Sequence, residues 1–180
     1  MKISKRIALI ILILVTLMLS FLAYMGLFNK MTITEKQVGP YTIVYEDITG
    51  AYTKTGPVLD NLYKELKADG IEATEALGLY YDDPKNVPAE KLRCKVGIII
   101  TPEQEKQIDE KGLHYSMMTI DQTHSIVTTF PMRNKLSYML GVLKAYPALS
   151  NAMNEKGYQP TPSLEIYGNN EITYAFTITK

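Results

Sequence analysis

The chain opens with a long apolar run. Residues 7–28 contain no charged side chain. As an α-helix at about 1.5 Å per residue, this run would span roughly 33 Å, close to the ~30 Å hydrocarbon thickness of a bilayer. A cleaved signal peptide is the alternative, but its apolar stretch is usually about 7–15 residues and it needs small residues before the cleavage point. Bulky Phe21 and Tyr24 stand two residues before Ala23 and Gly26. The pattern therefore favours an uncleaved transmembrane helix.

The flanks of this helix predict its orientation. Residues 1–6 carry Lys2, Lys5 and Arg6, whereas only Lys30 and Lys36 follow closely. Basic residues concentrate on the cytoplasmic side of a span. We therefore expect a single-pass membrane protein with a cytoplasmic N-terminus and an extracytoplasmic domain, joined by a polar tether over residues 29–37.

After the tether, the pattern alternates between β-branched or aromatic runs and helical spacing of apolar residues. Strands are predicted at 41–46, 77–82, 95–100, 125–130, 163–167 and 172–178, and helices at 57–70 and 136–157. Because proline cannot donate to the preceding turn, the second helix is expected to kink or break near Pro147. The turn Gly168-Asn169-Asn170 predicts a hairpin between the last two strands.

The order strand, helix, strand, strand occurs twice at nearly equal spacing. The second strand begins 36 residues after the first in one half, from Tyr41 to Leu77. In the other half it begins 38 residues later, from Ser125 to Ser163. This regularity predicts an α+β fold of duplicated βαββ units, with repeat one at 38–101 and repeat two at 120–180. Each half alone leaves a sheet face bare, so we expect the halves to pack together around a cleft.

Composition and charge narrow the possible functions. Basic and acidic residues balance at 19 each, and residues 31–180 alone hold 15 basic against 19 acidic groups. A nucleic-acid binder needs a basic excess, so no nucleic-acid partner is expected. The single cysteine, Cys94, excludes an intramolecular disulfide and a paired-cysteine zinc site. His114 and His124 lie in no haem-attachment motif. We therefore expect neither a cofactor nor a metal.

Two motifs resemble a known family. Residues 77–84 (LGLYYDDP) and 162–168 (PSLEIYG) are similar to the GyrI-like small-molecule-binding family, whose wider superfamily includes SOUL relatives. The resemblance implies a duplicated βαββ fold over residues 38–180, with a ligand cleft at its pseudo-two-fold axis. Residues 129–132 (TFPM) and 146–149 (YPAL) add a likeness to the membrane-anchored, testis-expressed ER-phagy receptor type of that family. That type also places one transmembrane helix before the domain.

The resemblance and strand alternation together select Glu165 as the leading candidate for ligand binding. In the family, the acid of this motif lies at the base of the pocket. Alternation puts Leu164 and Ile166 on one face of the strand and Glu165 and Tyr167 on the other. If the apolar pair faces the helix-packed core, the acid and the phenol face the cleft. A partly desolvated carboxylate beside tyrosine rings favours a poorly hydrated cation; the alternative is an ordinary solvated strand acid.

The other candidates for the pocket wall are aromatic or flexible. Tyr80 and Tyr81 occupy the matching position of repeat one, and alternation sends one to each face. Phe130 and Met132 lie at the end of the first strand of repeat two. Methionine adapts to varied ligands, although plain core packing is the commoner role for such residues.

Three functions fit these features. The first is a membrane-anchored domain that binds small hydrophobic or cationic molecules between its repeats. The second is a hydrolase of small electrophilic substrates that uses Glu165 as a general base, which requires burial to raise the pKa of Glu165. The third is a protein-interaction adaptor resembling an ER-phagy receptor. That receptor signals through a long tail, whereas this sequence stops at Lys180, so we expect the adaptor role to lack its effector. A protein partner stays unknown.

Overall fold

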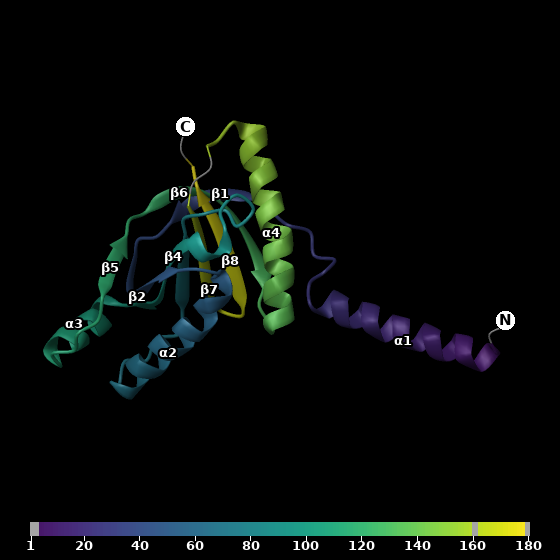
Figure 1. Ribbon diagram of the computed structural model, residues 1–180, viewed down its shortest axis with the longest axis horizontal. Coiled ribbons are helices and arrows are strands. Elements are labelled where there is room, and N and C mark those ends of the chain that lie inside the picture. The colour runs from purple at the N-terminus through teal and green to yellow at the C-terminus, as the bar shows by residue number, and fades with distance from the viewer. Residues whose placement is uncertain (1–3, 160–161, 179–180) are drawn as a thin grey trace.

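The computed structural model describes residues 4–159 and 162–178, and it places an isolated helix beside an eight-stranded antiparallel sheet (Figure 1). Lys2 of the basic flank and the last two residues of the expected domain lie outside the described residues. The helices are α1 (Lys5–Tyr24), α2 (Thr55–Ala68), α3 (Pro102–Glu110) and α4 (Lys135–Lys156). The strands are β1 (Thr34–Val38), β2 (Tyr41–Thr49), β3 (Ala76–Tyr80), β4 (Arg93–Ile100), β5 (Met117–Ile120), β6 (Thr123–Pro131), β7 (Ser163–Gly168) and β8 (Glu171–Thr177).

The apolar run forms α1, a helix of 20 residues with no buried residue, in which an 18-residue stretch has a mean hydropathy of 2.8. By length and composition it is able to cross a membrane. It ends at Tyr24, four residues before the predicted end at Phe28. The chain then turns into the domain, where Met25 is only 1% exposed. A side chain at Gly26 would lie 2.9 Å from the Phe130 ring, so the chain leaving α1 lies directly against the domain.

The expected tether is wrong in its second half. Residues 34–38 form β1, which pairs with β6 at one end of the sheet. Four of its five residues are exposed, so the strand has almost no apolar alternation to reveal it. Its partner strand, not its own sequence, holds it in place.

The duplicated βαββ unit is confirmed. Repeat one is β2-α2-β3-β4, repeat two is β6-α4-β7-β8, and the sheet order is β1-β6-β8-β7-β3-β4-β2-β5. The two repeats join where β3 pairs with β7. There Gly78 lies opposite Glu165, and these two residues also correspond when LGLYY is aligned with LEIYG. Because Gly78 and Glu165 are equivalent positions of the two repeats and also pair across the β3–β7 junction, the pseudo-two-fold axis passes between them.

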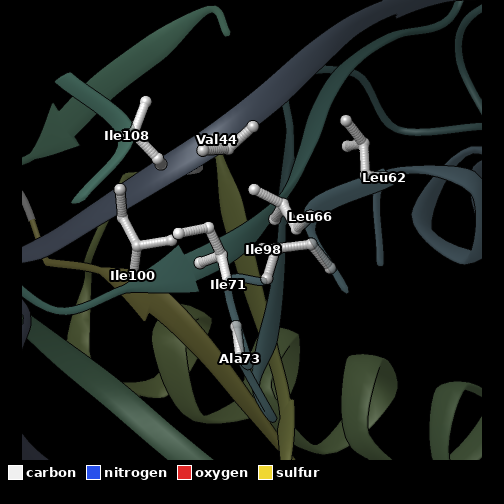
Figure 2. Packing of buried hydrophobic residues seen from close by; sticks show 8 residues of the cluster. All are labelled: Val44, Leu62, Leu66, Ile71, Ala73, Ile98, Ile100 and Ile108. Carbon is white, nitrogen blue, oxygen red and sulfur yellow. The ribbon is translucent and has the colours of Figure 1, made fainter. Parts of the chain in front are cut away.

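Both long helices cover the same face of the sheet. In repeat one, Leu62 and Leu66 of α2 pack on Val44 and Ile98 (Figure 2). In repeat two, Ala145 and Leu149 of α4 lie in one cluster with residues of β6 and β8. The opposite face is also apolar, and there Val38 of β1 and Ile43 of β2 share one cluster although their strands are far apart in the sheet order. The sheet is therefore curved, with its two ends close together on that face.

Three local features differ from the sequence prediction. Helix α4 runs without a break from Lys135 to Lys156 with Pro147 inside it, so the expected break is absent there. Helix α3 was not predicted because it has a single buried residue, Ile108. Strand β5 is a four-residue addition that pairs with β2.

A buried glutamate among tyrosines as the candidate site

Glu165 lies at the centre of the sheet, on the pseudo-two-fold axis, with only 3% of its surface exposed. Strand β7 places it, with Gly78 of β3 on one side and Tyr174 of β8 on the other. It points to the face that carries α2 and α4, because Tyr146 of α4 contacts it directly. A carboxyl in this position is surrounded by protein on every side.

Two tyrosine hydroxyls satisfy the carboxylate. The Tyr146 hydroxyl donates to Oε1 of Glu165 at 2.6 Å, and the Tyr167 hydroxyl donates to Oε2 at 2.5 Å. The hydroxyls of Tyr80 and Tyr167, which are equivalent residues of the two repeats, lie 2.9 Å apart in a further hydrogen bond. Short O–H···O⁻ bonds of this kind are charge-assisted and stronger than neutral ones. The network therefore joins both repeats and α4 through one carboxyl group.

The glutamate and its surrounding rings form what we call the Glu165 cluster. Its members are Glu165, Tyr80, Tyr138, Tyr146, Tyr167 and Tyr174. The Tyr138 ring lies 6.2 Å from that of Tyr167, and the Tyr146 ring stands edge-on to Tyr174 at 5.9 Å. Among the described residues, the buried hydroxyl of Tyr174 has no hydrogen-bond partner.

Burial dominates the electrostatics of this cluster. It raises the pKa of Glu165 above the ordinary glutamate value, although the hydrogen bonds from Tyr146 and Tyr167 oppose the rise. Burial, and then the negative charge of Glu165, raise the pKa of Tyr138 to about 12. The same two causes hold the pKa of Tyr80 well above its usual value. The tyrosines therefore stay protonated as donors near neutral pH, and the shifted carboxyl is the acidic group among them.

Gly78 allows the Tyr80 ring to lie over the axis. A Cβ at this position would lie 2.6 Å from Cε2 and 2.8 Å from the hydroxyl of Tyr80. We expect Gly78→Ala to displace this buried ring and to lower the free energy of unfolding by about 1–3 kcal/mol. Urea unfolding of the full chain in detergent measures this. Gly56→Ala, whose Cβ would meet nothing within 4 Å, is the control, and equal stability of the two variants would contradict the packing.

The expected direction of Glu165 is wrong in one respect. The prediction that Glu165 and Tyr167 face a cleft between the repeats requires Leu164 and Ile166 to face the helix-packed core. Instead Leu164 and Ile166 pack in the cluster on the helix-free face, and Glu165 and Tyr167 lie under α4. The helix-free face needs apolar residues because the curved sheet packs on itself there. Glu165 lies at the junction of the repeats, opposite Gly78 of β3.

Of the other residues predicted to line the site, two belong to the Glu165 cluster and three lie elsewhere in the domain. Tyr80 and Tyr167 belong to the Glu165 cluster. Tyr81 lies apart from the cluster and is partly exposed. Burial raises the pKa of its hydroxyl; the charge of Lys95 opposes the rise and that of Asp47 adds to it. Phe130 is a fully buried core residue beneath Gly26 and Gly141, and Met132 is a partly buried residue at the edge of the same core.

Sequence reasoning missed Tyr138, Tyr146 and Tyr174 as site residues. Tyr138 and Tyr146 are eight residues apart, which is about two helical turns and places them on one face of α4. Tyr174 lies opposite Glu165 in the β7–β8 hairpin. Both relations can be derived from the predicted elements, but only if the helix face that meets the sheet is known.

Two surface hollows in the described part of the chain are lined by no residue of this cluster. One is lined by Glu65, Ala68, Asp69, Leu113, His114 and Tyr115. The other is lined by residues of the segment after α1, of the end of β6 and the loop that follows it, and of the β7–β8 turn, including Lys30, Arg133 and Asn170. In residues 4–159 and 162–178, no three His, Cys, Asp or Glu side chains lie together in a way that could hold a metal ion.

Comparison with known proteins identifies related sequences. Residues 31–176 match the profile of the GyrI-like small molecule binding domain. The chain is 30% identical over 163 residues to the testis-expressed protein 264 homolog of Mus musculus, covering 86% of this chain and 51% of the relative. The chain spans about half the length of the curated mammalian relatives it matches.

Solved structures share the fold at low sequence identity. The protein in a cryo-EM structure of an EcmrR–DNA complex superposes with a TM-score of 0.59 at 12% identity, covering 98% of this chain and 71% of that one. SAV2435 bound to tetraphenylphosphonium superposes with a TM-score of 0.51 at 11% identity, covering 83% and 94%. At this identity the likeness concerns the fold alone. The expectation that this chain binds no nucleic acid therefore rests on its charge and stays a prediction.

Proposed function

Because the chain belongs to the GyrI-like small-molecule-binding domain family, we propose that it is a membrane-anchored receptor domain that binds small hydrophobic cations at the Glu165 cluster. The observation that carries the proposal is a buried carboxylate on the pseudo-two-fold axis with tyrosine rings around it. Helix α1 is the proposed single membrane span, and the basic N-terminal flank favours an extracytoplasmic domain.

The chemistry of the cluster suits a poorly hydrated cation. A buried carboxylate is costly unless it is paired, and a cation beside it would remove that cost. Tyrosine faces add an attraction of about 0.5–2 kcal/mol for a desolvated cation. The unpartnered Tyr174 hydroxyl supplies a further polar contact. An inorganic ion of high hydration energy would gain much less from these rings.

The cluster is closed as it stands, so binding requires α4 to move. Tyr138 and Tyr146 of α4 are partly exposed, whereas Glu165 beneath them is buried. A ligand would displace the Tyr146 hydroxyl from Oε1 and take its place. The SAV2435 structure, which holds tetraphenylphosphonium, supports the choice of this cation as a probe.

We expect wild-type protein in phosphatidylcholine nanodiscs to bind radiolabelled tetraphenylphosphonium saturably in equilibrium dialysis. Glu165→Gln keeps the size of the side chain and removes its charge, and it should weaken binding at least tenfold, which corresponds to about 1.4 kcal/mol. Empty nanodiscs correct for partition of the cation into lipid. Glu46→Gln, which changes an exposed strand acid, should bind like the wild type.

Other outcomes would reassign the function. Equal binding by the wild type and Glu165→Gln would remove Glu165 from the site, and no saturable binding of any cation in a panel would overturn the proposal. Hydrolysis of an activated ester that is lost in Glu165→Gln and kept in Glu46→Gln would favour the hydrolase. A specific protein captured by the domain and unaffected by Glu165→Gln would favour the adaptor.

A further inference from the structure

Helix α4 has an exposed apolar face that the proposed ligand site does not use. Leu136, Met139 and Leu143 are 36%, 58% and 68% exposed. Spacings of three and four residues put them on one side of the helix, and we call them the α4 stripe. The other side of α4 is buried against the sheet through Gly141, Ala145 and Leu149. Exposed leucines and a methionine in a continuous row mark an interaction surface.

Two contacts hold the α4 stripe beside the end of α1. The Arg133 guanidinium lies 4.0 Å from the centre of the Tyr24 ring, in the last turn of α1. The Lys144 ammonium donates to the carbonyl oxygens of Leu27 and Asn29, each at 2.5 Å. The stripe lies between Arg133 and Lys144 along α4. The surface is therefore attached at both ends to the segment that leaves the apolar helix.

The relative orientation of α1 and α4 determines how α4 would lie on a bilayer that α1 spans. Helix α1 leaves the domain on the side on which α4 lies, and it runs across the direction of α4 (Figure 1). Its 20 residues give a length of about 30 Å, the thickness of the hydrocarbon core. Tyr24, at its end, is then at the interface, where tyrosine is enriched. If α1 stands across the bilayer, α4 lies along the bilayer surface.

Charge on α4 also suits a lipid surface. Residues 133–154 contain Arg133, Lys135 and Lys144 and no acidic side chain, and the last two residues of α4, Glu155 and Lys156, balance each other. Residues 31–180 as a whole have four more acids than bases. Basic residues at the rim of an apolar helix face attract anionic headgroups while the apolar side chains enter the acyl boundary. The one acid lining the nearby hollow is Glu171.

We propose that the α4 stripe is a second membrane contact, which lays the domain on the same bilayer that α1 spans. This rests on the anchoring role of α1 in the proposed function. The occupant is the bilayer because the stripe is continuous with the end of α1. The same helix carries Tyr138 and Tyr146, so the membrane contact and the cover of the Glu165 cluster belong to one element.

The test uses the full chain in vesicles of phosphatidylcholine and phosphatidylglycerol, with an environment-sensitive fluorophore on one introduced cysteine. Leu143→Cys reports on the stripe, Leu14→Cys on α1, and Tyr63→Cys on an exposed position of α2. Native Cys94 is buried, and wild-type protein treated with the fluorophore gives the background. Lipids carrying a nitroxide on the acyl chain quench labels in the bilayer, whereas iodide quenches labels in water.

We expect lipid nitroxides to quench the label at position 143 several-fold more than the label at 63, with iodide showing the reverse order. Anchoring itself fails if the label at position 14 escapes the lipid nitroxides. If position 14 is quenched while 143 is as open to iodide as 63, the second contact is wrong and anchoring stands. A label at 143 shielded from both quenchers would mean that protein covers the stripe, which also overturns the proposal.

Discussion

Gly97→Ala is expected to lower the free energy of unfolding by about 3 kcal/mol or more, because the added methyl meets backbone that cannot yield. A Cβ at Gly97 would lie 2.4 Å from the Val44 carbonyl oxygen and 3.1 Å from Cα of Tyr45. Tyr45 is the direct partner of Gly97 in the β2–β4 pair. Relief would require the two strands to separate at the centre of repeat one, where α2 packs. Urea unfolding of the full chain, followed by circular dichroism, measures the loss.

The matched control separates this contact from the general effect of removing a glycine. Gly56→Ala lies in the first turn of α2 with open space around its Cβ. Alanine favours helix by up to about 1 kcal/mol over glycine, so Gly56→Ala should leave stability unchanged or raise it. Wild-type stability in Gly97→Ala would show that β2 and β4 are not spaced as described.

The repeat could be predicted from the sequence because its elements follow two clear periods. Strand runs such as residues 125–130 are rich in β-branched and aromatic residues, helical runs such as residues 58–66 have one apolar face, and their order repeats at a near-constant spacing. The antiparallel hairpin of β7 and β8 followed from Gly168-Asn169-Asn170. Asn169 and Asn170 both have positive φ in the structure, as a two-residue hairpin turn requires.

Elements that are stabilised mainly by contacts with other parts of the chain could not be predicted from their own sequence. The sequence of β1 is TEKQV, a polar segment that becomes a strand because the edge of β6 supplies hydrogen bonds. Helix α3 is largely polar, and its one signal is local: Thr101 and Gln104 cap each other in a capping box. Pro147 did not end α4 because the buried residues on either side, Ala145 and Leu149, keep both halves on the sheet.

Only part of the candidate site could be predicted from the sequence, because the rest depends on contacts between distant elements. The motif that contains Glu165 pointed to the right residue, and alternation paired it with Tyr167. Which face they occupy depends on the curvature of the sheet, which buries Leu164 on the helix-free side. The tyrosines of α4 reach Glu165 across long sequence separations, and no local pattern encodes that contact.

The double variant Tyr146→Phe/Tyr167→Phe should destabilise the protein by about 3 kcal/mol near neutral pH, because hydrogen bonds to a charged group are each worth about 1.5–3 kcal/mol. Both rings stay in place, so packing is kept while the carboxylate of Glu165 loses its two donors. The pKa of Glu165, which burial already raises, should rise further. Urea unfolding of the full chain measures the loss.

The pH dependence identifies the carboxylate as the cause. A carboxyl whose folded pKa exceeds its unfolded pKa binds its proton more tightly when folded, so stability falls as pH rises from the ordinary glutamate range through the folded pKa. In the double variant this fall should continue to higher pH. The difference from the wild type should therefore grow as pH rises from the folded pKa of Glu165 in the wild type to its higher folded pKa in the double variant, by about 1.4 kcal/mol for each unit of further pKa rise.

Two controls separate this effect from the loss of neutral hydrogen bonds, since the same substitutions also break the contacts of Tyr146 with Ser163 and of Tyr167 with Tyr80. Those contacts do not change charge in this range, so they add a loss that is constant with pH. In a Glu165→Gln background the double substitution should show only that constant loss, and Tyr63→Phe on the surface should show none. A pH-independent loss that is no larger than the loss in the Glu165→Gln background would mean that Glu165 is uncharged throughout, and the attraction proposed for a cation would then have no source.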